Sequence, residues 1–154
     1  MSFYYTDLLL EAGNLLGEAK TANDIFETLI EYVNSALKPD LSCFYVNNTS
    51  DTSMKLKLKR GFTDAPDILQ KESELLCFLL ESRELLCLNS RKISPFEELL
   101  LNDSMNSGIA IAIFIKQQEY GALIINSKQP FYFKRKEIVF LESLASIITS
   151  KELK

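Results

Sequence analysis

The chain has 154 residues, of which 47% are hydrophobic and 25% charged, and its 17 basic and 21 acidic side chains give a formal net charge of −4. A chain of this length fits one domain that buries its own core, and the composition is that of a globular protein. The sequence contains no histidine, which excludes an imidazole general base, a histidine metal or haem ligand and a phosphorelay histidine.

The first forty residues predict two amphipathic helices. In residues 4–19, apolar side chains recur on one helical arc and acidic side chains on the other. Thr21 provides an N-cap for a second helix with the same periodicity, and Pro39 ends that helix. Two helices therefore precede the first strand.

The next two segments predict a β-hairpin. Residues 41–46 are aromatic and β-branched, and residues 54–60 alternate lysine with apolar side chains. This alternation places Leu56 and Leu58 on one face of the second strand. The opposite face carries three lysines, which are Lys55, Lys57 and Lys59. Lysines along a strand protect a sheet edge, so we expect this strand to be outermost, and attraction of an anionic ligand is the alternative.

The middle of the chain predicts shorter elements. A helical segment is expected over residues 64–82, followed by a short strand over residues 85–88. A short helix is expected over residues 94–101, with Pro95 at its first position.

The last third of the chain predicts the centre of the sheet and a final helix. Residues 108–115 are apolar at every position, so we expect cover on both faces. Residues 120–125 form the hairpin partner of that strand. We therefore predict an α+β fold: an antiparallel sheet of five to six strands with helices on both sides. Residues 1–154 form a single domain in this prediction, and terminal helices over residues 4–19 and 134–152 flank the sheet.

This order of elements resembles the GAF domain, a PAS-related sensory fold found in bacterial signalling proteins. The best local match is a strand that ends in Asn126 and Lys128, followed by Phe133 and by Glu137 at the start of the final helix. Ile138 stands where the family commonly has a second acidic residue. The match, although imperfect, supports the fold, and its departures from the family pattern disfavour a cyclic nucleotide as the ligand.

The resemblance implies a pocket between the sheet and its helical cover, where strand ends converge. The candidate ligand-binding residues at these ends are Cys43, Tyr45, Arg60, Phe62, Asn89 and Asn106. Which face of residues 41–46 lines the pocket is left open. The expected function is that of a small-molecule-sensing regulatory domain, which relays its ligand state through the terminal helices by a shift in population.

The cysteines raise one enzymatic alternative. One GAF family, the free methionine sulfoxide reductases, performs thiol chemistry in the pocket, and Cys77 and Cys87 lie in the region that this resemblance implies. An attacking cysteine is expected near the fourth strand, where this chain has Ile109, Ala110 and Ile111. We therefore expect no enzyme activity, inert thiols that pack in the core, and neither a metal nor another cofactor.

The final helix suggests how the chain associates. Its apolar side chains cover about half of its circumference, and its other side carries small serines. In the GAF family the first and last helices often form a dimer bundle that continues into an output domain. The residues expected in such a bundle, or in packing on the sheet, are Tyr4, Leu8, Leu15, Ile138, Leu141 and Ile148. A ligand-free dimerisation module of a signalling protein, with its pocket filled by its own side chains, is the competing function.

The remaining expectations concern location and partners. The N-terminus has no cationic start of a signal peptide. The longest apolar run, residues 109–115, is far shorter than the roughly 20 residues of a membrane span. The acidic balance disfavours nucleic acid. We expect a cytoplasmic protein without a membrane or nucleic-acid partner, which binds an unidentified small molecule and forms a homodimer through its terminal helices.

Overall fold

The computed structural model describes residues 3–47, 52–90, 96–115 and 120–150. Its elements follow the chain as α1 (Phe3–Glu18), α2 (Ala22–Leu37), β1 (Leu41–Asn47), β2 (Ser53–Arg60), β3 (Ile68–Gln70), α3 (Glu74–Ser82), β4 (Leu86–Leu88), the short 3-10 helix η2 (Glu97–Leu99), β5 (Ser107–Phe114), β6 (Tyr120–Ser127) and α4 (Arg135–Thr149). The strands pair antiparallel in the order β3-β2-β1-β6-β5-β4.

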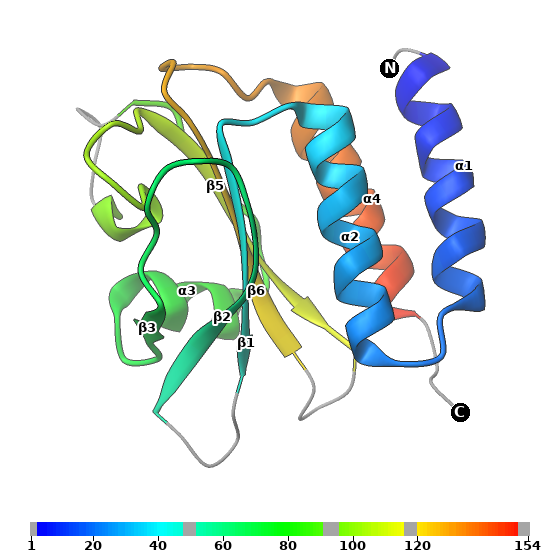
Figure 1. Cartoon of the computed structure of the whole chain (residues 1–154), viewed down its shortest axis with the longest axis horizontal. Coiled ribbons are helices and arrows are strands. Elements are labelled where there is room, and N and C mark those ends of the chain that lie inside the picture. The colour runs from blue at the N-terminus through cyan, green and yellow to red at the C-terminus, as the bar shows by residue number, and fades with distance from the viewer. Residues whose placement is uncertain (1–2, 48–51, 91–95, 116–119, 151–154) are drawn as a thin grey trace.

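Helices cover both faces of this sheet. Figure 1 shows α2 and α4 against one face, with α1 outside them as a further layer, and α3 on the opposite face. The predicted α+β fold with an antiparallel sheet is therefore confirmed. No helix in the described ranges is long and apolar enough to cross a membrane.

The two N-terminal helices form where the sequence predicts them. The Thr21 side chain accepts a hydrogen bond from the Asp24 backbone N–H at 3.1 Å and so caps α2. Lys38 adopts a left-handed conformation with a φ of 50°, and its N–H bonds the Asn34 carbonyl at 3.1 Å, which ends the helix immediately before Pro39.

The central strands β5 and β6 are buried on both faces. The isoleucines of β5, such as Ile109 and Ile111, pack in the core beneath α1, α2 and α4. The alternate residues Ala110 and Ala112 pack in a second core beneath α3. The expectation that helices cover both faces of this strand is confirmed.

The expectation that residues 54–60 form the outermost strand is wrong. The three-residue strand β3 pairs with the first part of β2, with Met54 opposite Leu69. The predicted helix over residues 64–82 is correspondingly shorter, because α3 begins only after Ser73, whose side chain accepts the Leu76 N–H at 3.2 Å. A strand of three residues is too short to show a period in the sequence.

The predicted alternation along β2 is also wrong. Phe44 lies opposite Leu58 and Tyr45 opposite Leu56, so Lys57 is an extra residue that forms a β-bulge. The bulge turns Leu56 toward the α3 core and Leu58 toward the opposite core, whereas strict alternation would place both on one face. All three lysines of this strand are nevertheless exposed.

The remaining elements differ from the predictions mainly at their ends. The predicted strand over residues 85–88 is β4, and the predicted helix over residues 94–101 is the short η2, with Pro95 outside the described residues. The final helix, predicted over residues 134–152, is α4, which ends at Thr149.

The C-terminal end of β6 holds the segment after η2 against the sheet. The buried Asn126 side chain donates a hydrogen bond to the Leu99 carbonyl at 2.9 Å and accepts one from the Leu101 N–H at 2.7 Å. Gly108 lies opposite Asn126 in the register, and a Cβ atom there would lie 2.4 Å from the Leu99 side chain. The close approach of these three residues therefore requires glycine at position 108.

Removal of the Asn126 side chain should destabilise the fold. The variant Asn126→Ala leaves the Leu99 carbonyl and the Leu101 N–H buried without partners, and we expect the free energy of unfolding to fall by about 2–4 kcal/mol. Urea denaturation of this variant and of Asn14→Ala, an exposed control on α1, measures the difference. Equal stability of the two variants would contradict the assigned role of Asn126.

Candidate functional site

Two of the predicted site residues lie together beneath α3. Cys43 and Tyr45 both point into the α3 core, so this face of residues 41–46 is the one that lies under the α3 cover. The Tyr45 hydroxyl donates a hydrogen bond to the Pro66 carbonyl at 2.7 Å, and burial raises its pKa. Burial also raises the pKa of the Cys43 thiol to about 12, although the ammonium of Lys59 opposes this shift.

Side chains fill the region between the sheet and α3. The fully buried side chains that meet there include Tyr45, Met54, Leu75, Leu76 and Leu79. Protein interiors of this kind have few voids larger than a water molecule. A ligand beneath α3 would therefore have to displace these side chains.

Arg60 and Phe62 lie away from Cys43 and Tyr45. The Arg60 guanidinium forms a salt bridge with Glu31 of α2 at 2.6 Å, on the opposite side of the sheet. Phe62 is fully exposed, at the rim of a depression of about 340 Å³ that Asp64 and Asn102 also line. Neither residue reaches the α3 core.

Asn89 and Asn106 form a second pair, where β4 ends and β5 begins. The Asn89 carbonyl accepts the Phe131 N–H at 2.6 Å, and the Asn106 side chain donates to the Lys128 carbonyl at 2.8 Å. Both bonds hold the segment between β6 and α4 against the sheet. The structure thus brings the six predicted residues together only in two pairs, Cys43 with Tyr45 and Asn89 with Asn106.

The three cysteines lie at separate places. Cys43 on β1 and Cys87 on β4 are three strand spacings apart, about 14 Å, and pack in opposite cores. A disulfide needs Cα atoms within about 7 Å, so this pair cannot form one in the folded chain. Cys77 on α3 donates a hydrogen bond from its Sγ to the Lys71 carbonyl at 3.4 Å.

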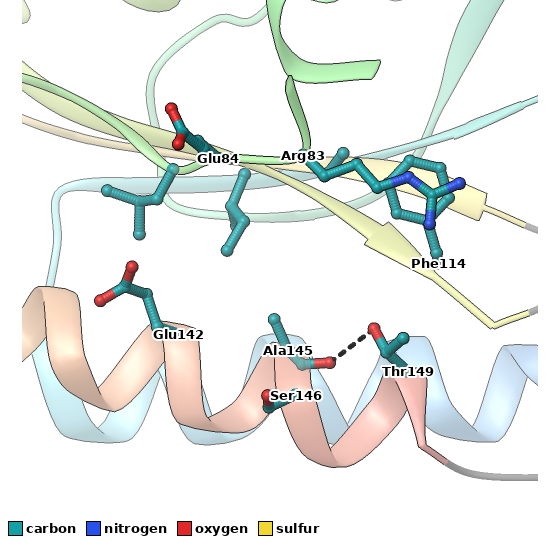
Figure 2. Close-up of a pocket in the computed structure, with 10 residues that line it drawn as sticks. Arg83, Glu84, Phe114, Glu142, Ala145, Ser146 and Thr149 are labelled. Carbon is teal, nitrogen blue, oxygen red and sulfur yellow. Dashed lines mark hydrogen bonds between the residues drawn. The ribbon is translucent and has the colours of Figure 1, made fainter. Parts of the chain in front are cut away.

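A cleft that the sequence did not indicate opens between the sheet and the final helix. It has a volume of about 340 Å³, and one wall comes from the end of α3 and from β5 while the other comes from α4. Figure 2 shows Arg83, Glu84 and Phe114 on the first wall and Glu142, Ala145, Ser146 and Thr149 on the second. We call it the α4 cleft, and its volume is in the range of small-ligand sites.

The end of α3 positions the charged side chains of the first wall. Arg83 caps α3 in the left-handed conformation, with a φ of 58°, and its N–H bonds the Leu79 carbonyl at 3.0 Å. Its guanidinium lies 4.1 Å from the centre of the Phe114 ring, a cation–π contact. The next residue, Glu84, is held by a bond from its N–H to the Ser82 hydroxyl at 3.1 Å.

Sequence reasoning missed these residues for a physical reason. Arg83, Phe114 and Glu142 come from three elements that are adjacent only in the folded chain. Each of them in isolation is typical of a helix end, an exposed strand end or a solvated helix face. Only the pairing of β4 with β5, and the packing of α4 on β5, bring them to one place.

Comparison with known proteins identifies the fold through structure. No protein-family profile matches the sequence, and no curated protein matches it. The free methionine-R-sulfoxide reductase of Neisseria meningitidis, solved with its substrate, superposes with a TM-score of 0.78 at 15% identity, over 94% of this chain and 86% of the reductase. The corresponding reductase of Staphylococcus aureus in its reduced form superposes with a TM-score of 0.75 at 18% identity, over 94% and 92% of the two chains.

A GAF domain is equally similar. The GAF domain of an Acinetobacter phosphoenolpyruvate-protein phosphotransferase superposes with a TM-score of 0.76 at 19% identity, over 97% of this chain and 92% of that domain. The chain therefore has a GAF-like fold, as its sequence resemblance implied.

The same comparisons correct one expectation. We expected no enzyme activity, because a third pocket cysteine is missing and histidine is absent. The reductases of Neisseria meningitidis and Staphylococcus aureus, however, are enzymes with this fold. These comparisons contradict the expectation of no enzyme activity, because the GAF-like fold is compatible with catalysis.

Proposed function

We propose that this GAF-like domain is a regulatory domain that binds a small molecule in the α4 cleft and relays its binding through the terminal helices. The observation that supports this function is the position of the cleft, because one of its walls is the final helix itself. A ligand there contacts both the sheet and a terminal helix. We further propose that a signalling partner or output domain responds to these helices.

Contacts between the terminal helices provide the path for this relay. α4 packs against α1, with the Tyr5 and Phe140 rings 5.2 Å apart. Gly13 of α1 lies close to Ile147 of α4, where an added Cβ would be 4.0 Å from the isoleucine side chain. A ligand that prefers one position of α4 therefore shifts the population of α1 as well, by as much as its affinities for the two positions differ.

The packing beneath α3 favours the cleft over the region that the sequence suggested. Met54, Leu76 and Leu79 fill the space next to Cys43 and Tyr45. This filled core also supports the competing function, a dimerisation module that holds no ligand beneath α3. The two functions differ in whether a ligand binds in the α4 cleft.

A thermal-shift screen against amino acids, amines and organic acids tests the cleft. Ligands that bind the native state should raise the melting temperature of the wild-type protein. The variant Ser146→Phe places a ring in the cleft from an exposed position, and it should abolish the shift for the same compounds.

The matched control is Ser143→Phe. Ser143 lies one turn earlier on α4. It lines the groove toward α1, which Ser146 also lines, but it does not line the α4 cleft. This variant should keep the ligand-induced shift. Compounds that stabilise the wild type and Ser146→Phe equally would place the ligand elsewhere.

We also propose that the domain forms a homodimer through α1 and α4. Leu10 and Leu15 of α1 are 67% and 45% exposed, although both are large apolar side chains. Of the residues expected in a bundle, Leu141 and Ile148 instead pack on the sheet, Leu8 and Ile138 are half-buried, and the Tyr4 side chain lies outside the described residues. The dimer therefore depends on the outer face of α1.

Sedimentation velocity over a range of protein concentrations tests the dimer. Leu10→Glu introduces a charge at the exposed face of α1, and it should shift the protein toward monomer. Ile68→Glu makes the same kind of change at another exposed apolar side chain, on β3, and should leave the dimer intact. A wild-type protein that stays monomeric at every concentration would contradict the proposal.

A second candidate function is the reduction of free methionine-R-sulfoxide. The structural likeness to two such reductases favours it, together with the three free cysteines. Free thiols also suit the reducing cytoplasm, where we propose that the protein is located. In this reaction the sulfoxide oxygen leaves as water, while two thiols are oxidised to a disulfide. We propose Cys77 as the attacking thiol, because burial raises the pKa of the Cys43 and Cys87 thiols, and an external dithiol supplies the second sulfur.

A turnover assay with free methionine-R-sulfoxide and dithiothreitol tests this second function. Activity should be lost in Cys77→Ser. It should remain in Cys43→Ser, because a thiol with a pKa of about 12 is almost wholly protonated at neutral pH. Turnover no faster than with dithiothreitol alone would rule out the reductase function.

A further inference from the structure

We propose that the α4 cleft binds a short zwitterion, with its ammonium group at the Glu142 carboxylate and its carboxylate group at the Arg83 guanidinium. This inference rests on the proposed function, because it names the class of ligand for the same cleft. It follows from the charges of the cleft, from their separation and from the apolar surface between them.

The cleft contains charges of both signs that do not pair with one another. Within the described residues, Arg60 pairs with Glu31, and no ion pair joins Arg83 to Glu84 or Glu142. In Figure 2 the Glu142 carboxylate lies toward one end of the cleft, the Glu84 carboxylate points away from α4, and the guanidinium lies toward the other end beside Phe114. The cleft therefore has an anionic end and a cationic end.

The structure holds each end in place. Stacking on Phe114 uses the face of the Arg83 guanidinium, and the N–H donors in its plane suit a carboxylate. Glu142 projects from the middle of α4, and Arg83 caps the end of α3. The two ends are on separate elements, so their separation depends on how α4 packs on the sheet.

Between the two ends the cleft is lined by apolar and small side chains. Leu85 and Ile111 lie on the sheet side, and Ala145 lies on α4. The residues of α4 that line the cleft extend over about 10 Å, because Glu142 and Thr149 are seven residues apart and a helix rises about 1.5 Å per residue. A ligand that spans both ends therefore has an apolar chain between its two charged groups.

A ligand with one charge satisfies only one end. An amine leaves the guanidinium without a carboxylate, and a simple carboxylate leaves Glu142 without a cation and is repelled by it. The structure thus favours compounds such as an ω-amino acid or a short peptide with free ends over an amine or an acid of the same length.

Three probes of equal chain length test the inference: 6-aminohexanoate, hexylamine and hexanoate. Their dissociation constants are measured by NMR titration of the full chain at low ionic strength, where screening is weak. We expect the dissociation constant of 6-aminohexanoate to be lower than that of either other probe by a factor of about three or more. The reason is that 6-aminohexanoate forms two exposed charge pairs and each of the others forms one. In the variant Arg83→Gln, 6-aminohexanoate should bind no more tightly than hexylamine. In Glu142→Gln, it should bind no more tightly than hexanoate.

Glu27→Gln, an exposed glutamate on α2, is the matched control and should change none of the three affinities. Equal binding of 6-aminohexanoate and hexylamine, or an advantage that persists in Arg83→Gln, would overturn the inference. If all three probes bind equally well and Ser146→Phe abolishes their binding, the zwitterion proposal is wrong. The cleft would then still be the regulatory site. Probe binding that persists in Ser146→Phe would contradict both proposals.

Discussion

The side chain of Asn126 joins the central strand β6 to the segment after η2, and the arrangement on both faces of the sheet depends on this junction. Its two hydrogen bonds hold Leu99 and Leu101 over Gly108, at the start of β5. Its backbone carbonyl accepts the Asp40 N–H at 3.0 Å, and so fixes the start of β1 as well. One residue thus positions the strand that enters the α3 core and the strand that forms a wall of the α4 cleft.

The double-sided core explains why the cleft lies at the edge of the sheet. Because β5 and β6 are apolar on both faces, each face is covered by packed side chains, and fully buried side chains fill the region beneath α3. At the edge of the sheet, β4 has only three residues. There α4 faces the end of α3 and the strand β5, and the charged residues that follow α3 line the opening.

Periodicity and capping residues predicted most of the fold. The two N-terminal helices, the central hairpin and the final helix follow from apolar spacing and from Thr21 and Pro39. Two residues of the GAF resemblance in the last third of the chain have structural roles. Phe133 is buried, and the Glu137 side chain accepts a hydrogen bond from the Lys134 N–H at 3.3 Å at the start of α4. The strand β3 was missed because three residues show no period, and the bulge at Lys57 because it depends on the partner strand.

The candidate site could be predicted far less well than the fold. Cys43 and Tyr45 do lie beneath α3, but the sequence does not reveal that leucines fill the space around them. Arg60 turns toward Glu31 because β2 places it on the other face of the sheet. The α4 cleft depends on the proximity of residues far apart in the sequence, such as Phe114 with Arg83 and α4 with β5, and no local pattern in the sequence predicts it.

The central claim is that the final helix senses the occupancy of the α4 cleft. Hydrogen–deuterium exchange of the full chain, with and without saturating 6-aminohexanoate, tests it most directly. We predict slower exchange in residues 142–149 of α4 and in the facing part of α1. Unchanged exchange in α4, with protection confined to α3 and the strands beneath it, would contradict the account.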